Sequence, residues 1–172
     1  SQAFKIKRSK LLLINSFVFF CMDNEYFKII DLEKHETRDN QDQHVNGSLT
    51  VVWRDWDNII KDELKMIYVT SVKPSEIKGP HLHTKRNSYF VCIHGEVIFV
   101  IQKKSGEYEE IRTDADRPVL IFIPKNVPVA HININDGVSR ILTLADVSWK
   151  PSDNEMKNIS FNDYDWNKWK KN

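Results

Sequence analysis

The sequence predicts an all-β fold, a jelly roll or small β-barrel followed by a short C-terminal helix. From about residue 45 onward, short segments rich in β-branched and aromatic residues follow one another. Turn-forming residues separate them, as at His94-Gly95 and Ser105-Gly106. Because helical periodicity is nearly absent between these segments, the favoured architecture is an antiparallel sandwich or jelly roll.

Eight strands are expected in chain order. They cover residues 49–53, 64–72, 88–93, 96–102, 108–112, 119–123, 129–134 and 139–145. Asn46-Gly47, the pair Pro124 and Pro128, and Asp136-Gly137 supply further turns. After the last strand, Ser152 to Glu155 resembles a helix capping box, and residues 163–171 are expected to form a short amphipathic helix.

Length, charge and cysteine content limit the function classes. A chain of 172 residues with a formal net charge of +1 suits one domain with a substantial core. Near-neutral charge provides no strong field for nucleic acid or an anionic membrane. The two cysteines, Cys21 and Cys92, form no disulfide framework, and Cys92 is expected to be a reduced core residue of a cytoplasmic protein.

Residues 1–21 differ from the rest of the chain. Basic residues 5–10 precede the apolar residues 11–20, as in a signal peptide, but this run is too short to span a bilayer and no small-residue cleavage pattern follows. We expect residues 1–21 to be an N-terminal extension, either a β-arm that packs on a partner or a segment that is not native. Residues 22–172 are then the single domain.

Two histidines one residue apart, His81 and His83, stand just before the most strand-like stretch. Alternate side chains of an extended backbone share a face, so both should point into the barrel. An imidazole there can abstract a proton near neutral pH or bind a metal. The spacing alone leaves both uses open.

The segment Lys78-Gly79-Pro80-His81-Leu82-His83, followed by Gly95-Glu96-Val97 and by Pro124, His131 and Asn135, resembles the cupins over roughly residues 45–166. Within the cupins it is similar to the dTDP-4-dehydrorhamnose 3,5-epimerases. It also resembles the dTDP-4-keto-6-deoxyhexose 3,4-ketoisomerases, whose Arg-Gly-x-His-x-His segment it matches with Lys78 in place of arginine. The resemblance implies an isomerase of deoxysugar and O-antigen biosynthesis that uses no metal and no cofactor.

The same resemblance implies the reaction. A base would remove the proton at C3, and in some members also at C5, next to the C4 ketone of a nucleotide-linked 4-keto-6-deoxyhexose. His81 occupies the position of the base, and Phe161-Asn162-Asp163 resembles the segment whose aspartate holds it. Asp163 also fits the N-cap of the last helix. His83 would polarise O4 or act as a second base.

The general acid and the substrate-binding cations are less defined. The strand at 141–145 lacks the tyrosine acid of the epimerases, and Tyr89 is a substitute by strand phase, although core packing also explains it. His131 is expected to contact the sugar or the diphosphate. Four cations are candidates for the diphosphate, although each also fits an ordinary surface charge: Lys78, Arg54, Lys85 and Arg86.

Other functions remain open. A 3,4-ketoisomerase would use the same residues, and a metal-dependent cupin would use His81, His83 and His131. The metal alternative is weakened because Asn87 and Ser88 stand where metallocupins carry a glutamate. A non-catalytic sugar-binding cupin is the third alternative. The resemblance also implies a homodimer formed by exchanged strands, and it leaves the nucleotide base open.

Overall fold

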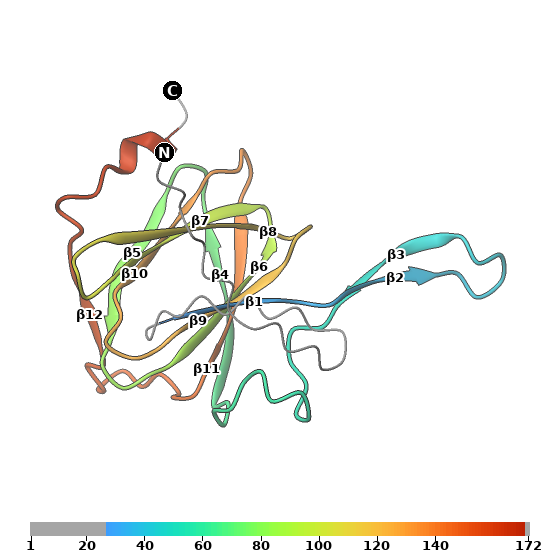
Figure 1. Ribbon diagram of the computed structural model, residues 1–172, viewed down its shortest axis with the longest axis horizontal. Coiled ribbons are helices and arrows are strands. Elements are labelled where there is room, and N and C mark those ends of the chain that lie inside the picture. Colours follow the sequence, from blue (N-terminus) through green and yellow to red (C-terminus); the bar gives the residue numbers. More distant parts are fainter. Residues whose placement is uncertain (1–26, 171–172) are drawn as a thin grey trace, which may run out of the picture.

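The computed structural model describes residues 27–170, which form two packed β-sheets and a projecting ribbon (Figure 1). The first sheet contains, in spatial order, β1 (Lys28–Asp31), β9 (Val119–Ile123), β6 (Ser88–His94), β11 (Ser139–Ala145) and β4 (Met66–Val72). The second contains β12 (Met156–Asn158), β5 (Ile77–His83), β10 (Val129–Asn133), β7 (Glu96–Gln102) and β8 (Tyr108–Asp114). All pairings are antiparallel, and the predicted jelly roll is confirmed. The N-terminal extension predicted at residues 1–21 lies outside the described residues.

A two-stranded ribbon, β2 (Lys34–Arg38) and β3 (Val45–Thr50), projects from the body of the molecule (Figure 1). The amide of Asp39 donates to the carbonyl of His44 at its tip, and Gln43 there has a φ of 62°. The turn predicted at Asn46-Gly47 was wrong, since Gly47 lies within β3 opposite Thr37. The polar run 39–43 forms the turn instead.

The core lies between the two sheets. Alternate side chains of β6 point into it and away from it. Phe90 and Cys92 point inward, where the ring of Phe90 lies 5.4 Å from that of Phe99 on β7. Tyr89 and Val91 point to the opposite face of the sheet, into a second apolar cluster. Cys92 is a buried free thiol, as predicted, and burial raises its pKa to about 11.

The C-terminal segment covers the outer face of the second sheet. Phe161 and Tyr164 pack on Tyr108 of β8, each with ring centroids 5.0 Å apart. The predicted helix at 163–171 is a 3₁₀ helix, η1 (Trp166–Trp169), and Asp165 caps it by accepting from the amide of Asn167. No helix follows Ser152, so the capping-box prediction was wrong: the chain there leads into β12, the edge strand beside β5. Among the described residues, no helix is long and apolar enough to cross a membrane.

Candidate active site

A cavity of about 180 Å³ lies between the two sheets, and both contribute side chains to it. His81 and His83 reach it from β5, as the alternation of an extended strand predicts. The other lining residues are Tyr68, Thr70, Lys78, Arg86, Phe90, Val129, His131 and Met156. The cavity therefore combines two imidazoles from one strand with a third from β10, two cations and a phenol.

The Lys-Gly-Pro-His segment of β5 contains an irregularity that shapes this cavity. His81 pairs with Val129 and Lys78 pairs with His131, so β5 has one residue more than β10 between these pairs. This bulge brings Lys78 to the face of His81, although the two are three residues apart. Gly79 has a φ of +86°, and a Cβ there would lie 2.9 Å from the Val129 carbonyl oxygen. Only glycine fits this position without strain.

His81 is held from the C-terminal strand. Its Nδ1 lies 2.9 Å from Oδ1 of Asn158, and the two residues are register partners on β5 and β12. An amide oxygen only accepts hydrogen bonds, so Nδ1 carries the proton and donates. The Nε2 atom then keeps its lone pair, which a base requires.

The expected partner of His81 was Asp163, and the structure corrects this. Asp163 is exposed in the turn after Phe161, beyond β12, whereas Asn158 lies directly opposite His81. The aromatic-x-Asp pattern at residues 161–163 coincides with the packing of Phe161 on the outer face of the sheet. The N-cap alternative for Asp163 is also wrong, because Asp165 caps the helix.

His83 belongs to a buried charged cluster. Its Nδ1 lies 3.0 Å from Oε1 of Glu155, and its Nε2 lies 2.6 Å from Nη2 of Arg86. Glu155 and Arg86 are buried, and their charged groups approach to 3.8 Å. The same Nη2 also lies 3.1 Å from Nδ1, so the guanidinium is close to both ring nitrogens. Because a guanidinium only donates and Nδ1–H is directed to Glu155, Nε2 is the nitrogen that can accept from Arg86. Burial and the Arg86 charge lower the pKa of His83 against the opposing effect of Glu155, so the ring is held neutral.

His131 lies at the side of the cavity, near His81 and Lys78. Its ring packs on Phe99 with centroids 5.2 Å apart, and its Nε2 atom is buried without a hydrogen-bond partner in the described structure. Burial, with the nearby charges of His81 and Lys78, lowers the pKa of His131 to about 3. A neutral imidazole with an unused nitrogen is available to a bound ligand.

Tyr89, the predicted acid, points away from the cavity. Its hydroxyl donates to Oδ2 of Asp62 at 2.7 Å within the outer apolar cluster, and burial and this bond raise its pKa. Strand phase explains the correction, since Phe90 is the β6 residue that lines the cavity. Tyr68 of β4 lines the cavity instead, with the Arg86 guanidinium 5.8 Å from its ring centroid.

The four candidate cations separate into two groups. Lys78 and Arg86 line the cavity, but Arg86 is already engaged by His83 and Glu155. Lys85 is exposed and does not line the cavity. Arg54 lies near the base of the ribbon, paired with Glu33 and Asp57. The structure therefore does not bring Arg54 or Lys85 to the histidines.

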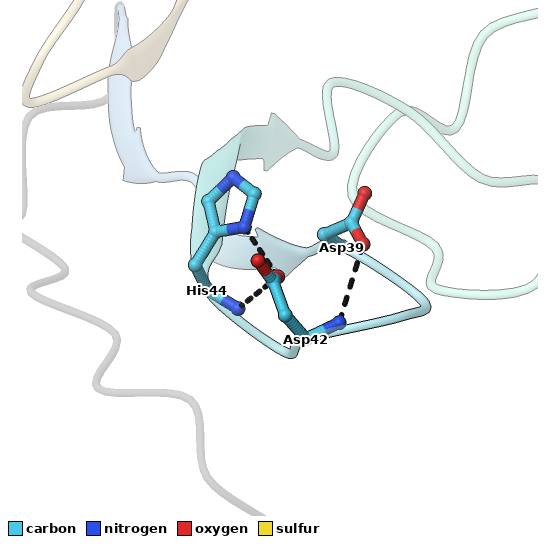
Figure 2. Close-up of side chains that lie close together, drawn as sticks. All are labelled: Asp39, Asp42 and His44. Atoms are coloured by element: carbon cyan, nitrogen blue, oxygen red, sulfur yellow. Dashed lines mark hydrogen bonds and ion pairs between the residues drawn. The ribbon is translucent and has the colours of Figure 1, made fainter.

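A three-histidine metal site does not fit this arrangement. Within residues 27–170, the single group of three candidate ligand atoms that all lie within 4.8 Å of one another is Asp39, Asp42 and His44. Figure 2 shows these side chains at the tip of the ribbon, where Asp42 accepts from His44 and Asp39 accepts from the amide of Asp42. They stabilise the turn at the tip of the β2–β3 ribbon, which projects from the two sheets (Figure 1), and none of them lines the cavity. At His83, both ring nitrogens are already in contact with Glu155 or Arg86, so neither offers a free lone pair to a metal ion.

A jelly roll with a histidine-lined cavity between its sheets defines a cupin-type protein. A family model described as FdtA: WxcM-like, C-terminal matches residues 25–165, and the chain belongs to this family. This match confirms the family resemblance of the sequence. No curated protein matches the chain.

Solved structures that share the fold include the following three. A dTDP sugar isomerase from Desulfovibrio desulfuricans is 16% identical with a TM-score of 0.70, over 83% of this chain and 92% of that one. QdtA, a sugar 3,4-ketoisomerase from Thermoanaerobacterium thermosaccharolyticum in complex with TDP, is 21% identical with a TM-score of 0.61, over 77% and 88%. NovW, a 4-keto-6-deoxy sugar epimerase from Streptomyces spheroides, is 13% identical with a TM-score of 0.65, over 86% and 77%.

Proposed function

We propose that the protein is an epimerase of a nucleotide-linked 4-keto-6-deoxyhexose that acts on the proton at C3, next to the C4 ketone; action at C5 as well is the variant of this reaction that the exchange experiment below separates. The observation that carries the proposal is the hydrogen bonding of His81, which leaves one ring nitrogen with its lone pair. Its Nδ1 donates to Asn158, so the Nε2 lone pair is left for a ligand in the cavity. An acidic C–H beside a ketone is the kind of proton that a neutral imidazole can remove.

The proposed reaction begins with His81. Its Nε2 takes the C3 proton, the electron pair of the C–H bond forms the C3–C4 double bond, and the carbonyl electrons move onto O4. The developing charge on O4 needs a donor, and the neutral His131 has an unused buried nitrogen at this cavity. Tyr68 lies on the other sheet, so its phenol can return a proton to the opposite face of C3. A base and an acid on opposite walls give inversion.

The nucleotide part of the substrate requires a cation. Lys78 is the cavity-lining cation that has no ion-pair partner within the described residues, and its side chain is exposed. We assign it to the diphosphate, where it takes the place of the family's arginine. The relative QdtA was solved with TDP, which supports a nucleotide-linked sugar as the substrate class.

A second candidate function is a 3,4-ketoisomerase. The paired histidines match the segment of such enzymes, and QdtA is described as one. The same His81 would remove the C3 proton, but the resulting enediol would lose its O3 proton and gain a proton at C4. The two functions therefore share the base and differ in where the proton returns.

Solvent exchange tests both candidates. The protein is incubated with dTDP- or CDP-linked 4-keto-6-deoxyhexoses in deuterated water, and the sugar is followed by NMR. An epimerase places deuterium at C3, or at C3 and C5, with inverted configuration, whereas a ketoisomerase places it at C4 of a 3-keto product. If no carbon of any of these sugars gains deuterium above the buffer control, the proposal is wrong.

We further propose a homodimer that acts in the cytoplasm. Ile67 and Val69 on the outer face of the edge strand β4 are 60% and 51% exposed, and Val45 and Leu49 are exposed on the projecting ribbon. Exposed apolar side chains on an edge strand and a ribbon are suited to pairing with a second copy. Light scattering should give twice the chain mass, and a monomer at micromolar concentration would contradict this. A free buried Cys92 is consistent with a reducing compartment.

A further inference from the structure

We infer that Asn158 is a positioning residue, which fixes the tautomer of His81 and orients the ring through a neutral acceptor. The tautomer itself does not depend on the proposed function, but its use in proton transfer does. Neither the sequence pattern nor the family resemblance gives Asn158 a role. Its Oδ1 lies 2.9 Å from Nδ1 of His81.

The contact is built by the C-terminal strand. In the register of β12 on β5, Asn158 stands opposite His81 and Met156 stands opposite His83. The strand is held at both ends: the amide of Thr84 donates to the Glu155 carbonyl at 2.8 Å, and the amide of Ile159 donates to the Pro80 carbonyl at 3.2 Å. The position of the Asn158 amide relative to the ring is therefore set by backbone pairing.

The two histidines have one charged and one neutral partner, both from residues 155–158. Glu155 gives His83 a carboxylate, whose charge Arg86 offsets, whereas Asn158 gives His81 a neutral amide. A neutral acceptor selects the Nδ1–H tautomer but adds no negative charge to stabilise the imidazolium. A carboxylate at position 158 would orient the ring in the same way and also favour its protonated form.

Other charged and titratable groups surround His81 and stay constant when residue 158 is changed. Those that line the cavity with His81 are Lys78 and His83 on β5, His131 on β10, Tyr68 on β4 and Arg86 before β6, and Glu155 lies behind them in contact with His83. A change in titration that follows a substitution of Asn158 alone therefore reports this contact.

The test uses the full chain, without substrate, with ¹⁵N-labelled histidine rings. Long-range ¹H–¹⁵N spectra between pH 5 and 8 identify which nitrogen of His81 carries the proton, and H81N assigns the signals. We expect Nδ1–H with a bare Nε2 in the wild type, a mixture of tautomers in N158A, and Nδ1–H in N158D. Because a carboxylate within hydrogen-bond distance favours the charged ring, N158D should also move the titration midpoint upward by about one pH unit.

Lys157 provides the matched control, because it is the exposed neighbour on the same strand and faces the other side. K157Q should leave both tautomer and midpoint unchanged. Two results would overturn the inference. One is a wild-type His81 ring that carries its proton at Nε2; the other is an N158D titration midpoint within about 0.2 pH units of the wild type, because a carboxylate at hydrogen-bond distance should shift it further.

Kinetics then separate positioning from mere structural support. We expect N158A to lower kcat by about 10- to 100-fold with little change in KM, because Asn158 touches the base and does not line the cavity. N158D should move the acid limb of kcat/KM upward by the same amount as the NMR midpoint. A purely structural role would lower activity at every pH without moving the limb. If the NMR results hold and the wild type exchanges no deuterium into the sugar, the proposed function fails and the tautomer assignment stands.

Discussion

The guanidinium of Arg86 donates to Nε2 of His83 at 2.6 Å, and this bond makes the two cavity histidines chemically different. His83 has both nitrogens engaged, by Glu155 and by Arg86, whereas no side chain within residues 27–170 bonds to Nε2 of His81. A histidine without a lone pair cannot act as a base until the arginine moves away. The sequence offers two imidazoles that look equivalent, and the arginine three residues after His83 engages only that one of the pair.

The buried cluster of Arg86, His83 and Glu155 predicts a large effect on stability. Replacing Arg86 by methionine leaves Glu155 buried without its cation, and we expect the free energy of unfolding to fall by about 3–5 kcal/mol. Urea unfolding followed by fluorescence measures this loss. Lys85→Met, at the exposed neighbour, should change stability by less than about 0.5 kcal/mol.

The coupling within this cluster is testable with a double variant. Adding Glu155→Gln to Arg86→Met removes the unpaired carboxylate, so the double variant should lose less than the sum of the single losses, by about 1–3 kcal/mol. Strict additivity would mean that the two groups do not stabilise each other.

Phenylalanine variants of two tyrosines test which phenol donates the proton: Tyr68, which lines the cavity, and Tyr89, which does not. Tyr68→Phe removes the cavity phenol but not the base, so we expect deuterium exchange at C3 to continue while inverted product falls by about 100-fold. Tyr89→Phe should leave the product yield unchanged and cost about 1 kcal/mol, because it removes only the hydrogen bond to Asp62. NMR of the product and urea unfolding give the two readouts. Full product formation by the Tyr68 variant would assign the proton donor elsewhere.

The lowered pKa of His131 predicts that the free energy of unfolding decreases towards acid pH. Its pKa is lowered to about 3 in the folded protein, against about 6.5 in an unfolded chain. Between these values the unfolded state binds more protons, so this histidine's contribution is complete above pH 6.5 and is lost as the pH falls towards 3. The slope contributed by one proton is at most about 1.4 kcal/mol per pH unit.

Urea unfolding at pH 7, 6, 5 and 4 measures this dependence. His131→Phe removes the titrating ring and keeps an aromatic group against Phe99, so its stability should fall less steeply towards acid pH. Equal slopes for the wild type and the variant would show that the ring is not held neutral by the fold.

Strands were predictable from the sequence where a segment contains many β-branched residues and has turn-forming residues at both ends. The strands at 96–102, 119–123 and 139–145 have the predicted bounds because β-branched residues fill them and turns flank them. The short β1, β2 and β12 were missed, since three to five residues of mixed polarity give no periodic pattern. β5 (Ile77–His83) was also absent from the eight expected strands, because its lysine, glycine, proline and histidines give a weak strand signal.

The cavity was predictable only in part, because it depends on long-range pairing. The shared face of His81 and His83 follows from local strand geometry. Their partners, Asn158 and Glu155, come from more than 70 residues further along the chain, and only the register of β12 brings them there. Glu155 was interpreted as part of a helix capping box, which concealed its contact with His83. Tyr68 lies in a strand in which half-buried and exposed residues alternate, and nothing else in the sequence distinguishes it from the other half-buried positions.

The central claim is that His81 is the base that removes the proton beside the ketone. Deuterium incorporation into a dTDP-linked 4-keto-6-deoxyhexose by wild type and His81→Asn, with circular dichroism to verify the fold of both, tests it most directly. Because a positioned general base contributes about 10²- to 10⁴-fold, we predict that the variant folds normally and exchanges at least about 100-fold more slowly. A folded His81→Asn protein that exchanges at the wild-type rate would contradict the claim.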